Sequence, residues 1–212
     1  QRTDPFEDFY EHTATALEKF PLPDDTPLGL VRALDRLGQQ YLQTLPEAVA
    51  NAATPRGEVL RSASARMVEI LGEMIALQEE LDWQCYGLYR LLEEDLTYRS
   101  NQPPPIYLGQ RAFEIAMDRK MATGELETTW FERHRSLPVT ELPTDWPEGY
   151  RQLVERRIEA IETSKDIALV ERPEYKRRWN VEPWEEQEER ALRTWLLDRL
   201  ETDRYWPDAR QP

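Results

Sequence analysis

Apolar side chains recur along the stretch from Gly57 to Leu92 at the spacing of one helix face. Their intervals alternate between three and four residues, a pattern typical of a helix that packs lengthwise against a partner helix. The seam predicted from this spacing consists of Leu60, Ala63, Met67, Ile70, Met74, Leu77 and Leu81. The spacing slips at Cys85 and then resumes. We therefore predict one long helix over this stretch, in which residues 60–81 form an arm and residues 82–92 a buried root.

The preceding segment carries a second amphipathic pattern. Asp24-Asp25-Thr26-Pro27 is typical of a helix start, where a capping side chain comes before a proline in the first turn. The apolar positions that follow share one face and are Leu30, Leu34, Leu37, Tyr41 and Leu45. Pro46 and the small, polar residues 51–55 predict a break. The two helices are then expected to form an antiparallel, coiled-coil-like hairpin over residues 27–100.

Shorter helical patterns separated by prolines fill the rest of the chain. We predict helices over about residues 109–121, 147–164 and 182–201, and a short strand or turn at residues 128–131. The apolar face predicted for the last helix consists of Trp184, Ala191, Leu192, Trp195, Leu196 and Leu200. The fold class is therefore mainly α, with a hairpin followed by a small helical domain and proline-rich connections. The predicted domains are an irregular tail (residues 1–26), the hairpin (residues 27–100) and a C-terminal helical domain (residues 101–212).

Composition and charge narrow the functional classes. Charged residues make up 32% of the 212 residues and hydrophobic residues 40%, a balance typical of amphipathic helices with solvated faces. The formal net charge of -14 repels a phosphate backbone. Any nucleic-acid contact must therefore come from a local basic patch or from a part of the protein outside this chain.

Cellular location is suggested by three further features of the sequence. Cys85 is the only cysteine, which indicates a reducing compartment. No stretch approaches the ~20 apolar residues of a membrane span, and no secretory signal opens the chain. We therefore predict a cytoplasmic protein without membrane contact. Because Gln1 rather than Met comes first, we also expect a piece of a longer polypeptide.

The sequence holds no complete motif of a catalytic, cofactor-binding or metal site. The two histidines, His12 and His134, belong to no HExxH arrangement, and the chain has no CxxC, GxGxxG, P-loop or GxSxG pattern. The constellation that remains as a candidate is Thr129, Glu132 and His134, although we interpret His134 as a surface or interface side chain. The acidic group at residues 79–82 could act as general acid and base, but such groups on helices usually mark the solvated face.

One basic segment is a candidate for contact with a nucleic acid. Three consecutive cations stand between aromatic residues at positions 175–179, and cations pair with phosphates while aromatics stack on bases. The candidate phosphate contacts are Lys176, Arg177, Arg178 and Trp179. The alternative is a structural ion-pair network, in which this segment is neutralised by Glu171, Glu174, Glu182, Glu185 and Glu186.

Several segments together resemble a known enzyme family. The longest are LQEELDWQCYGLY at residues 77–89 and IALVERPEYKRRW at residues 167–179, and shorter ones stand at residues 17–23, 108–115 and 127–134. In this order they resemble the adenine-specific DNA methyltransferases of the phage-growth-limitation (BREX) type. The resemblance spans most of residues 15–206. It implies a C-terminal region that follows the catalytic and target-recognition parts of a large enzyme.

For that whole enzyme, the resemblance implies transfer of a methyl group from S-adenosylmethionine to N6 of adenine in duplex DNA, as part of phage defence. This chain has neither the Asn-Pro-Pro-Tyr motif nor a glycine-rich cofactor loop, and residues 101–104 (NQPP) are only superficially similar. No catalytic or cofactor residue can therefore be carried over, and we expect the isolated chain to bind no cofactor and to be inactive. The implied partners are the rest of the methyltransferase, duplex DNA through it, and other phage-defence proteins.

Two functional hypotheses follow. The first is a non-catalytic accessory or spacer region, whose hairpin positions the DNA-reading part of the enzyme or recruits a partner. The second is a free-standing acidic helical scaffold for protein–protein interaction, whose surface mimics or avoids DNA. The native reading frame discriminates between them, because only the first requires a methyltransferase upstream.

Overall fold

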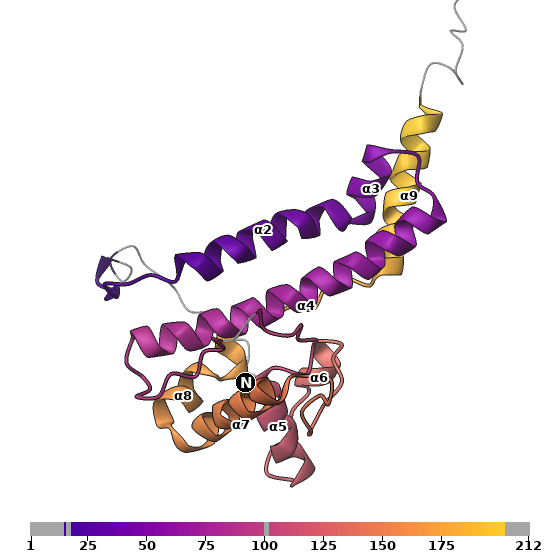
Figure 1. Ribbon diagram of the computed structural model, residues 1–212. Helices are drawn as coiled ribbons and strands as arrows, with labels where there is room; N and C mark the ends of the chain where they lie inside the picture. The colour runs from indigo at the N-terminus through magenta and orange to yellow at the C-terminus, as the bar shows by residue number, and fades with distance from the viewer. Residues whose placement is uncertain (1–14, 16–17, 100–101, 202–212) are drawn as a thin grey trace, which may run out of the picture. The chain divides into compact units, whose positions relative to one another are not determined.

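The computed structural model describes residues 15, 18–99 and 102–201, and this part of the chain is helical, without a β-strand (Figure 1). Its main helices are α2 (Leu28–Thr44), α3 (Pro46–Ala52), α4 (Gly57–Leu88), α5 (Ala112–Ala122), α6 (Trp130–Arg133), α7 (Glu148–Thr163), α8 (Lys165–Val170) and α9 (Trp184–Leu200), with a short 3-10 helix, η1 (Pro173–Tyr175). The predicted mainly α class is confirmed. The strand predicted as one option at residues 128–131 is wrong, because α6 begins there.

The chain divides into two compact units. Unit 1 comprises Gln1–Ala33 and Ile75–Asn180, and unit 2 comprises Leu34–Met74 and Val181–Pro212. The predicted domain boundary near residue 100 stays a prediction. Among the described residues, no helix is both long enough and apolar enough to cross a membrane.

Helix α4 begins at Gly57, as predicted, and keeps its apolar seam largely out of solvent. Four of the predicted seam residues are buried and three are half-buried: Leu60, Met67, Ile70 and Leu77, then Ala63, Met74 and Leu81. The helix ends at Leu88 rather than at Leu92. The reason is a turn at Arg90, whose backbone is left-handed (φ 56°) and lets the Leu91 N–H donate to the Tyr86 carbonyl at 2.9 Å.

Helix α2 follows the predicted face but buries none of its residues completely. The five predicted face positions, Leu30, Leu34, Leu37, Tyr41 and Leu45, are all half-buried. Within unit 2, a Cβ placed on Gly38 would meet the Met74 methyl group at 3.9 Å, so α2 and α4 approach each other there. An antiparallel, coiled-coil-like pairing along the full helices stays a prediction.

The core of unit 2 is formed where α3 packs on α9 (Figure 1). The sequence interpretation missed α3, because it took Pro46 as a break. Pro46 instead occupies the first turn of the helix, where its missing N–H leaves no bond unmade. Ala50 and Ala191 are buried at the contact. The predicted face of α9 is only partly correct, since Leu196 and Leu200 are exposed.

The core of unit 1 is built by α5 and α8, both packed on α7, together with the C-terminal part of α4. Ile115, Tyr150 and Ile167 are completely buried there. One loop requires glycine, because Gly109 has a φ of 92° and a Cβ on it would lie 2.1 Å from the Leu137 carbonyl oxygen. This close approach fixes the chain just before α5 begins.

Candidate functional site

The basic segment predicted to contact DNA follows η1 in unit 1, and its four candidate residues do not share one environment. Lys176 and Trp179 are buried, whereas Arg177 and Arg178 are exposed. An extended backbone sends neighbouring side chains in different directions, which is why three consecutive cations are separated here. The candidate site is therefore an inner part around Lys176 and an outer part at the two arginines.

The inner part is a cluster of three carboxylates around one ammonium group. Lys176 Nζ lies 2.6 Å from Asp82 Oδ2, 2.8 Å from Glu171 Oε1 and 3.8 Å from Glu79 Oε1. The Tyr86 hydroxyl donates to the same Glu171 oxygen at 2.5 Å. Glu79 and Asp82 come from α4, while Glu171 directly follows α8. The cluster therefore ties α4 to the segment that follows α8.

Burial and neighbouring opposite charges shift the pKa values of this cluster in opposite directions. Burial alone would lower the pKa of Lys176, but the carboxylates of Glu171, Glu79 and Asp82 hold it well above its ordinary value. Burial raises the pKa of Glu79 to about 7, Lys176 opposes that rise, and the other two carboxylates reinforce it. Lys176 is thus held charged, and the pKa of Glu79 is raised into the neutral range.

A pocket of about 450 Å³ lies over the cluster. Its walls are formed by Asp82, Tyr86, Leu169, Val170, Tyr175 and Lys176. The Lys176 ammonium is already engaged by carboxylates, and only 3% of its side chain is exposed. An anion in this pocket would meet more negative than positive charge. The geometry therefore suits a structural ion-pair network better than a phosphate site at Lys176.

A second buried ion pair joins α4 to α7. Both carboxylate oxygens of Glu80 accept from Arg157 Nη2 at 2.8 Å, and one of them also accepts from the Tyr98 N–H at 2.7 Å. The same guanidinium donates to the Leu96 carbonyl at 2.7 and 3.0 Å. Trp83 packs against it, with its ring centroid 5.3 Å from the guanidinium carbon. These contacts fix the loop that leaves α4 against α7.

A third buried pair organises the segments beneath the outer arginines. The Arg111 guanidinium donates twice to Glu114, at 2.8 and 3.0 Å, and once to the Arg177 carbonyl at 2.8 Å. The indole N–H of Trp130 donates to the same Glu114 at 3.1 Å, and His134 stacks on Trp130 with centroids 3.7 Å apart. One ion pair therefore supports the start of α5, helix α6 and the backbone of Arg177.

The sequence interpretation of these side chains needs two corrections. Glu79 and Glu80 were assigned to a solvated face, but both are buried, because α4 is covered on most sides here. His134 was interpreted as a surface or interface side chain, but it is buried against Trp130, and burial lowers its pKa. The sequence around these carboxylates does not indicate their cationic partners, because the partners are distant in the chain. Lys176, for example, follows Asp82 by 94 positions.

Each of the two exposed arginines, Arg177 and Arg178, lies near a buried aromatic side chain. The Arg177 guanidinium carbon lies 4.3 Å from the centre of the Trp179 ring, a cation–π contact with a buried indole. Arg178 lies close enough to His134 to help lower its pKa, after burial, which has the larger effect. All four candidate phosphate contacts stay predictions, and the structure separates the exposed Arg177 and Arg178 from the buried Lys176 and Trp179.

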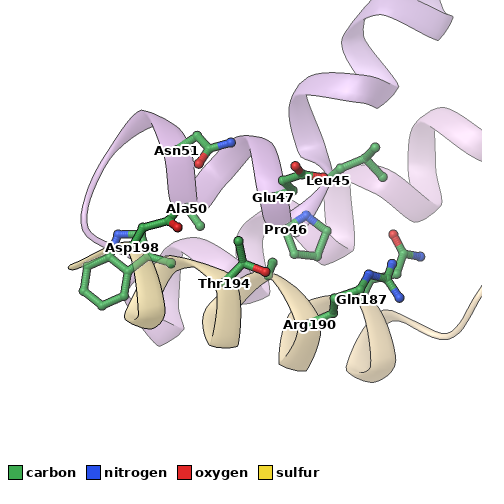
Figure 2. A pocket seen from close by; sticks show the side chains of 11 residues that line it. Leu45, Pro46, Glu47, Ala50, Asn51, Gln187, Arg190, Thr194 and Asp198 are labelled. Atoms are coloured by element: carbon green, nitrogen blue, oxygen red, sulfur yellow. The ribbon is translucent and has the colours of Figure 1, made fainter. Parts of the chain in front are cut away.

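Unit 2 contains a separate pocket of about 350 Å³ between α3 and α9. Figure 2 shows its two walls, with Pro46, Glu47 and Asn51 on one side and Arg190, Thr194 and Asp198 on the other. The Arg190 guanidinium is held by Glu182, with two contacts of 2.6 and 2.7 Å. The lining of this pocket therefore includes charged side chains of both signs.

No group of three or more His, Cys, Asp or Glu residues within residues 18–99 and 102–201 is arranged to hold a metal ion. Cys85 is half-buried, and burial raises the pKa of its thiol, which disfavours the reactive thiolate.

Comparison with known proteins gives two matches. The sequence model of a family described as a domain of unknown function (DUF7008) matches residues 74–212. The chain is also 50% identical, over 208 residues, to the adenine-specific methyltransferase PglX of Streptomyces coelicolor. That alignment takes in 96% of this chain but only 17% of the relative, so the chain is similar to one region of it. No solved structure matches.

Proposed function

Because this chain belongs to the family described as a domain of unknown function (DUF7008), we propose that it is a non-catalytic accessory region of an adenine-specific DNA methyltransferase. One observation carries the proposal: the 50% identity, over nearly the whole chain, to a region of a protein that bears that name. The remaining 83% of the relative's length would contain the parts that bind S-adenosylmethionine and transfer the methyl group to N6 of adenine.

The buried charges of unit 1 support an accessory rather than a catalytic role. The pairs Arg111–Glu114 and Glu80–Arg157 each use their hydrogen-bonding groups to join one helix to another segment. A catalytic acid or base needs a face open to substrate. These side chains are at most 4% exposed, so their charges stabilise the fold and hold its surface in place.

In the parent enzyme, this region would act at a distance from the reaction. Helix α4, 32 residues long, is suited to a spacer that positions the DNA-reading part or recruits a phage-defence partner. The exposed Arg177 and Arg178 would contribute contacts to the phosphates of duplex DNA. We propose that the complex works in the cytoplasm, where its DNA substrate is.

The direct test separates the chain from its parent. The isolated 212-residue chain and the intact methyltransferase that contains it are each incubated with duplex DNA and radiolabelled S-adenosylmethionine. We expect methyl transfer and cofactor binding only from the intact enzyme. Methyl transfer by the isolated chain would refute the accessory role.

The second candidate function is a free-standing acidic scaffold for protein–protein interaction. The observation that favours it is the net charge of -14, which is large for 212 residues and would keep DNA away from most of the surface. The native reading frame decides between the two candidates. A frame that opens just upstream of Gln1 supports the scaffold, and one that continues upstream into a methyltransferase supports the accessory region.

A further inference from the structure

The pocket over the Lys176 cluster combines apolar and charged walls. Leu169 and Val170 supply aliphatic side chains, and Tyr86 supplies an aromatic ring. Asp82 and Lys176 supply charge from the side of the cluster. The volume of about 450 Å³ falls within the range of pockets that bind small molecules. The pocket can therefore hold a ligand that has both an apolar and a charged part.

Negative charge exceeds positive charge in the cluster beneath this pocket. Among the described residues, one ammonium, that of Lys176, is shared by the carboxylates of Glu79, Asp82 and Glu171. The other cation that acts on Glu79 is Arg111, and it already forms an ion pair with a further carboxylate at 2.8 Å. Even when Glu79 is protonated, two carboxylates therefore share one ammonium.

One carboxylate oxygen of the cluster also lacks a donor. Glu171 Oε1 accepts from the Tyr86 hydroxyl and the Lys176 ammonium, whereas Glu171 Oε2 is buried without a hydrogen-bond partner among the described residues. Buried carboxylates normally have their acceptor sites satisfied, because an unpaired buried charge is costly. The two groups that bind Oε1 line the pocket, so the unsatisfied oxygen of the same carboxylate is close to the pocket.

We propose that this pocket binds an organic cation, a guanidinium or a primary ammonium group carried on an aliphatic stem. The charged head lies against Asp82, whose side chain is 23% exposed, whereas the side chains of Glu79 and Glu171 are at most 2% exposed. The stem lies along Leu169 and Val170, as the stem of a lysine lies along apolar surface. The bound cation balances the carboxylate charge that Lys176 alone leaves uncompensated.

The chemistry of the pocket favours an organic cation over other ligands. A bare metal ion needs several oxygen ligands at once, and in the described part of the chain no group of three His, Cys, Asp or Glu residues is arranged to hold one. An anion would add to the excess of negative charge, and a neutral ligand would leave it unchanged. The cation is supplied either by a free amine or by a lysine or arginine side chain elsewhere in the parent methyltransferase.

The test compares two ligands of the same shape, one charged and one neutral. n-Butylguanidinium and its neutral isostere n-butylurea are titrated into the 212-residue chain, and binding is followed through the NMR signals of the pocket residues. We expect n-butylguanidinium to bind with a dissociation constant of about 1 mM, as so small a ligand allows. We expect n-butylurea to bind about tenfold more weakly, because its hydrogen bonds lack the charge. Equal affinities, or no binding of n-butylguanidinium, would overturn the proposal.

A matched pair of variants tests the position of the charged head. Asp82→Asn removes the carboxylate that lines the pocket and keeps the shape of the side chain, so n-butylguanidinium should bind about tenfold more weakly. Asp145→Asn is the control, because Asp145 is an exposed aspartate of unit 1 outside this pocket, and it should bind as wild type does. An unchanged affinity in D82N, or an equal loss in D145N, would overturn the proposal. The comparison of the two ligands in the wild-type chain does not depend on whether D82N folds.

The intact methyltransferase separates the two sources of the cation, and this arm of the test rests on the proposed function. If a lysine or arginine side chain of the parent occupies the pocket, n-butylguanidinium should bind the isolated chain but not the intact enzyme. If the natural ligand is a free amine, both should bind n-butylguanidinium with similar affinity. Methyl transfer by the isolated chain would remove the accessory role and leave the pocket as proposed, whereas a lack of cation binding would remove only the pocket.

Discussion

At the scale of single residues, the structure shows why neighbouring cations have different uses. Lys176 is enclosed by Asp82, Glu171 and Glu79, whereas the next residue, Arg177, is exposed above Trp179. Removing a buried partner leaves uncompensated charge in a medium of low polarity, and removing an exposed one is nearly neutral. The two substitutions should therefore differ strongly in their effect on stability.

We expect Lys176→Met to lower the free energy of unfolding by about 3–5 kcal/mol, because two buried carboxylates and the half-buried Asp82 lose their shared cation. Methionine keeps much of the apolar stem, so the change isolates the charge. Urea denaturation followed by circular dichroism measures the loss. Arg177→Met is the control and should change the free energy of unfolding by less than about 0.5 kcal/mol. Similar losses in the two variants would contradict the structural role of Lys176.

Glu79 makes the same cluster sensitive to pH. Its pKa in the folded chain is about 7, against an ordinary value of 4.5, so the folded state holds the proton more tightly than the unfolded state. The contribution of this group to stability is therefore complete below pH 4.5 and is lost as pH rises through about 7. Between pH 4.5 and about 7, the contribution of Glu79 to the free energy of unfolding falls by at most about 1.4 kcal/mol per pH unit.

The variant Glu79→Gln carries no titratable group and should lack this contribution. Because other carboxylates change stability in the opposite direction, the quantity to compare is the difference between the variant and wild type. We expect this difference to move in favour of E79Q as pH rises from 5 to 8 in urea denaturation. Glu58→Gln, at the exposed start of α4, removes one carboxylate from the same helix and is the matched control. Parallel curves for E79Q and wild type would contradict the raised pKa.

At the scale of helices, the periodic spacing of apolar residues predicted more of the fold than it did of the candidate site. The start of α4 and the burial of its seam followed from the spacing of Leu60, Met67 and Ile70, because a helical repeat places them on one face. The end of α4 depends on the backbone of Arg90, which leaves no trace in the apolar pattern. Helix α3 was missed because Pro46 begins a helix as readily as it ends one.

The seam itself can be tested by truncation. Ile70 is 1% exposed, so Ile70→Ala should leave a cavity and lower the free energy of unfolding by about 2–5 kcal/mol. Val68 lies two positions away on the same helix and is 46% exposed. Val68→Ala should cost less than about 0.5 kcal/mol in the same urea titration. Equal costs would show that the seam does not face a partner.

At the scale of the molecule, the ion pairs between distant segments were beyond sequence reasoning, whereas the pair of Lys176 with Glu171 belonged to the ion-pair network that the sequence offered as an alternative. Glu80 and Arg157 meet only because α4 and α7 belong to the same core, and they are 77 positions apart. The acidic run on α4 looks like a solvated face until the surrounding helices are known. Only the family resemblance could point to function, because it depends on whole sequence segments rather than on pairs of residues that are distant in the chain.

The division into two units has a testable consequence, because each unit has a buried alanine in its own core. Ala191 on α9 is buried in unit 2, and Ala116 on α5 is buried in unit 1. An aspartate at either position buries a charge without a partner, which destabilises the structure around it. The substitutions add the same single negative charge, so each one is the control for the other.

We expect the damage to stay within the unit that carries the substitution, because local unfolding follows contiguous packed elements. In hydrogen exchange, Ala191→Asp should speed the exchange of α3 and α9 while α5 and α7 keep their protection. Ala116→Asp should do the reverse. If either variant raises exchange equally in all four helices, the chain unfolds as one cooperative body, and the two units are a property of packing rather than of stability.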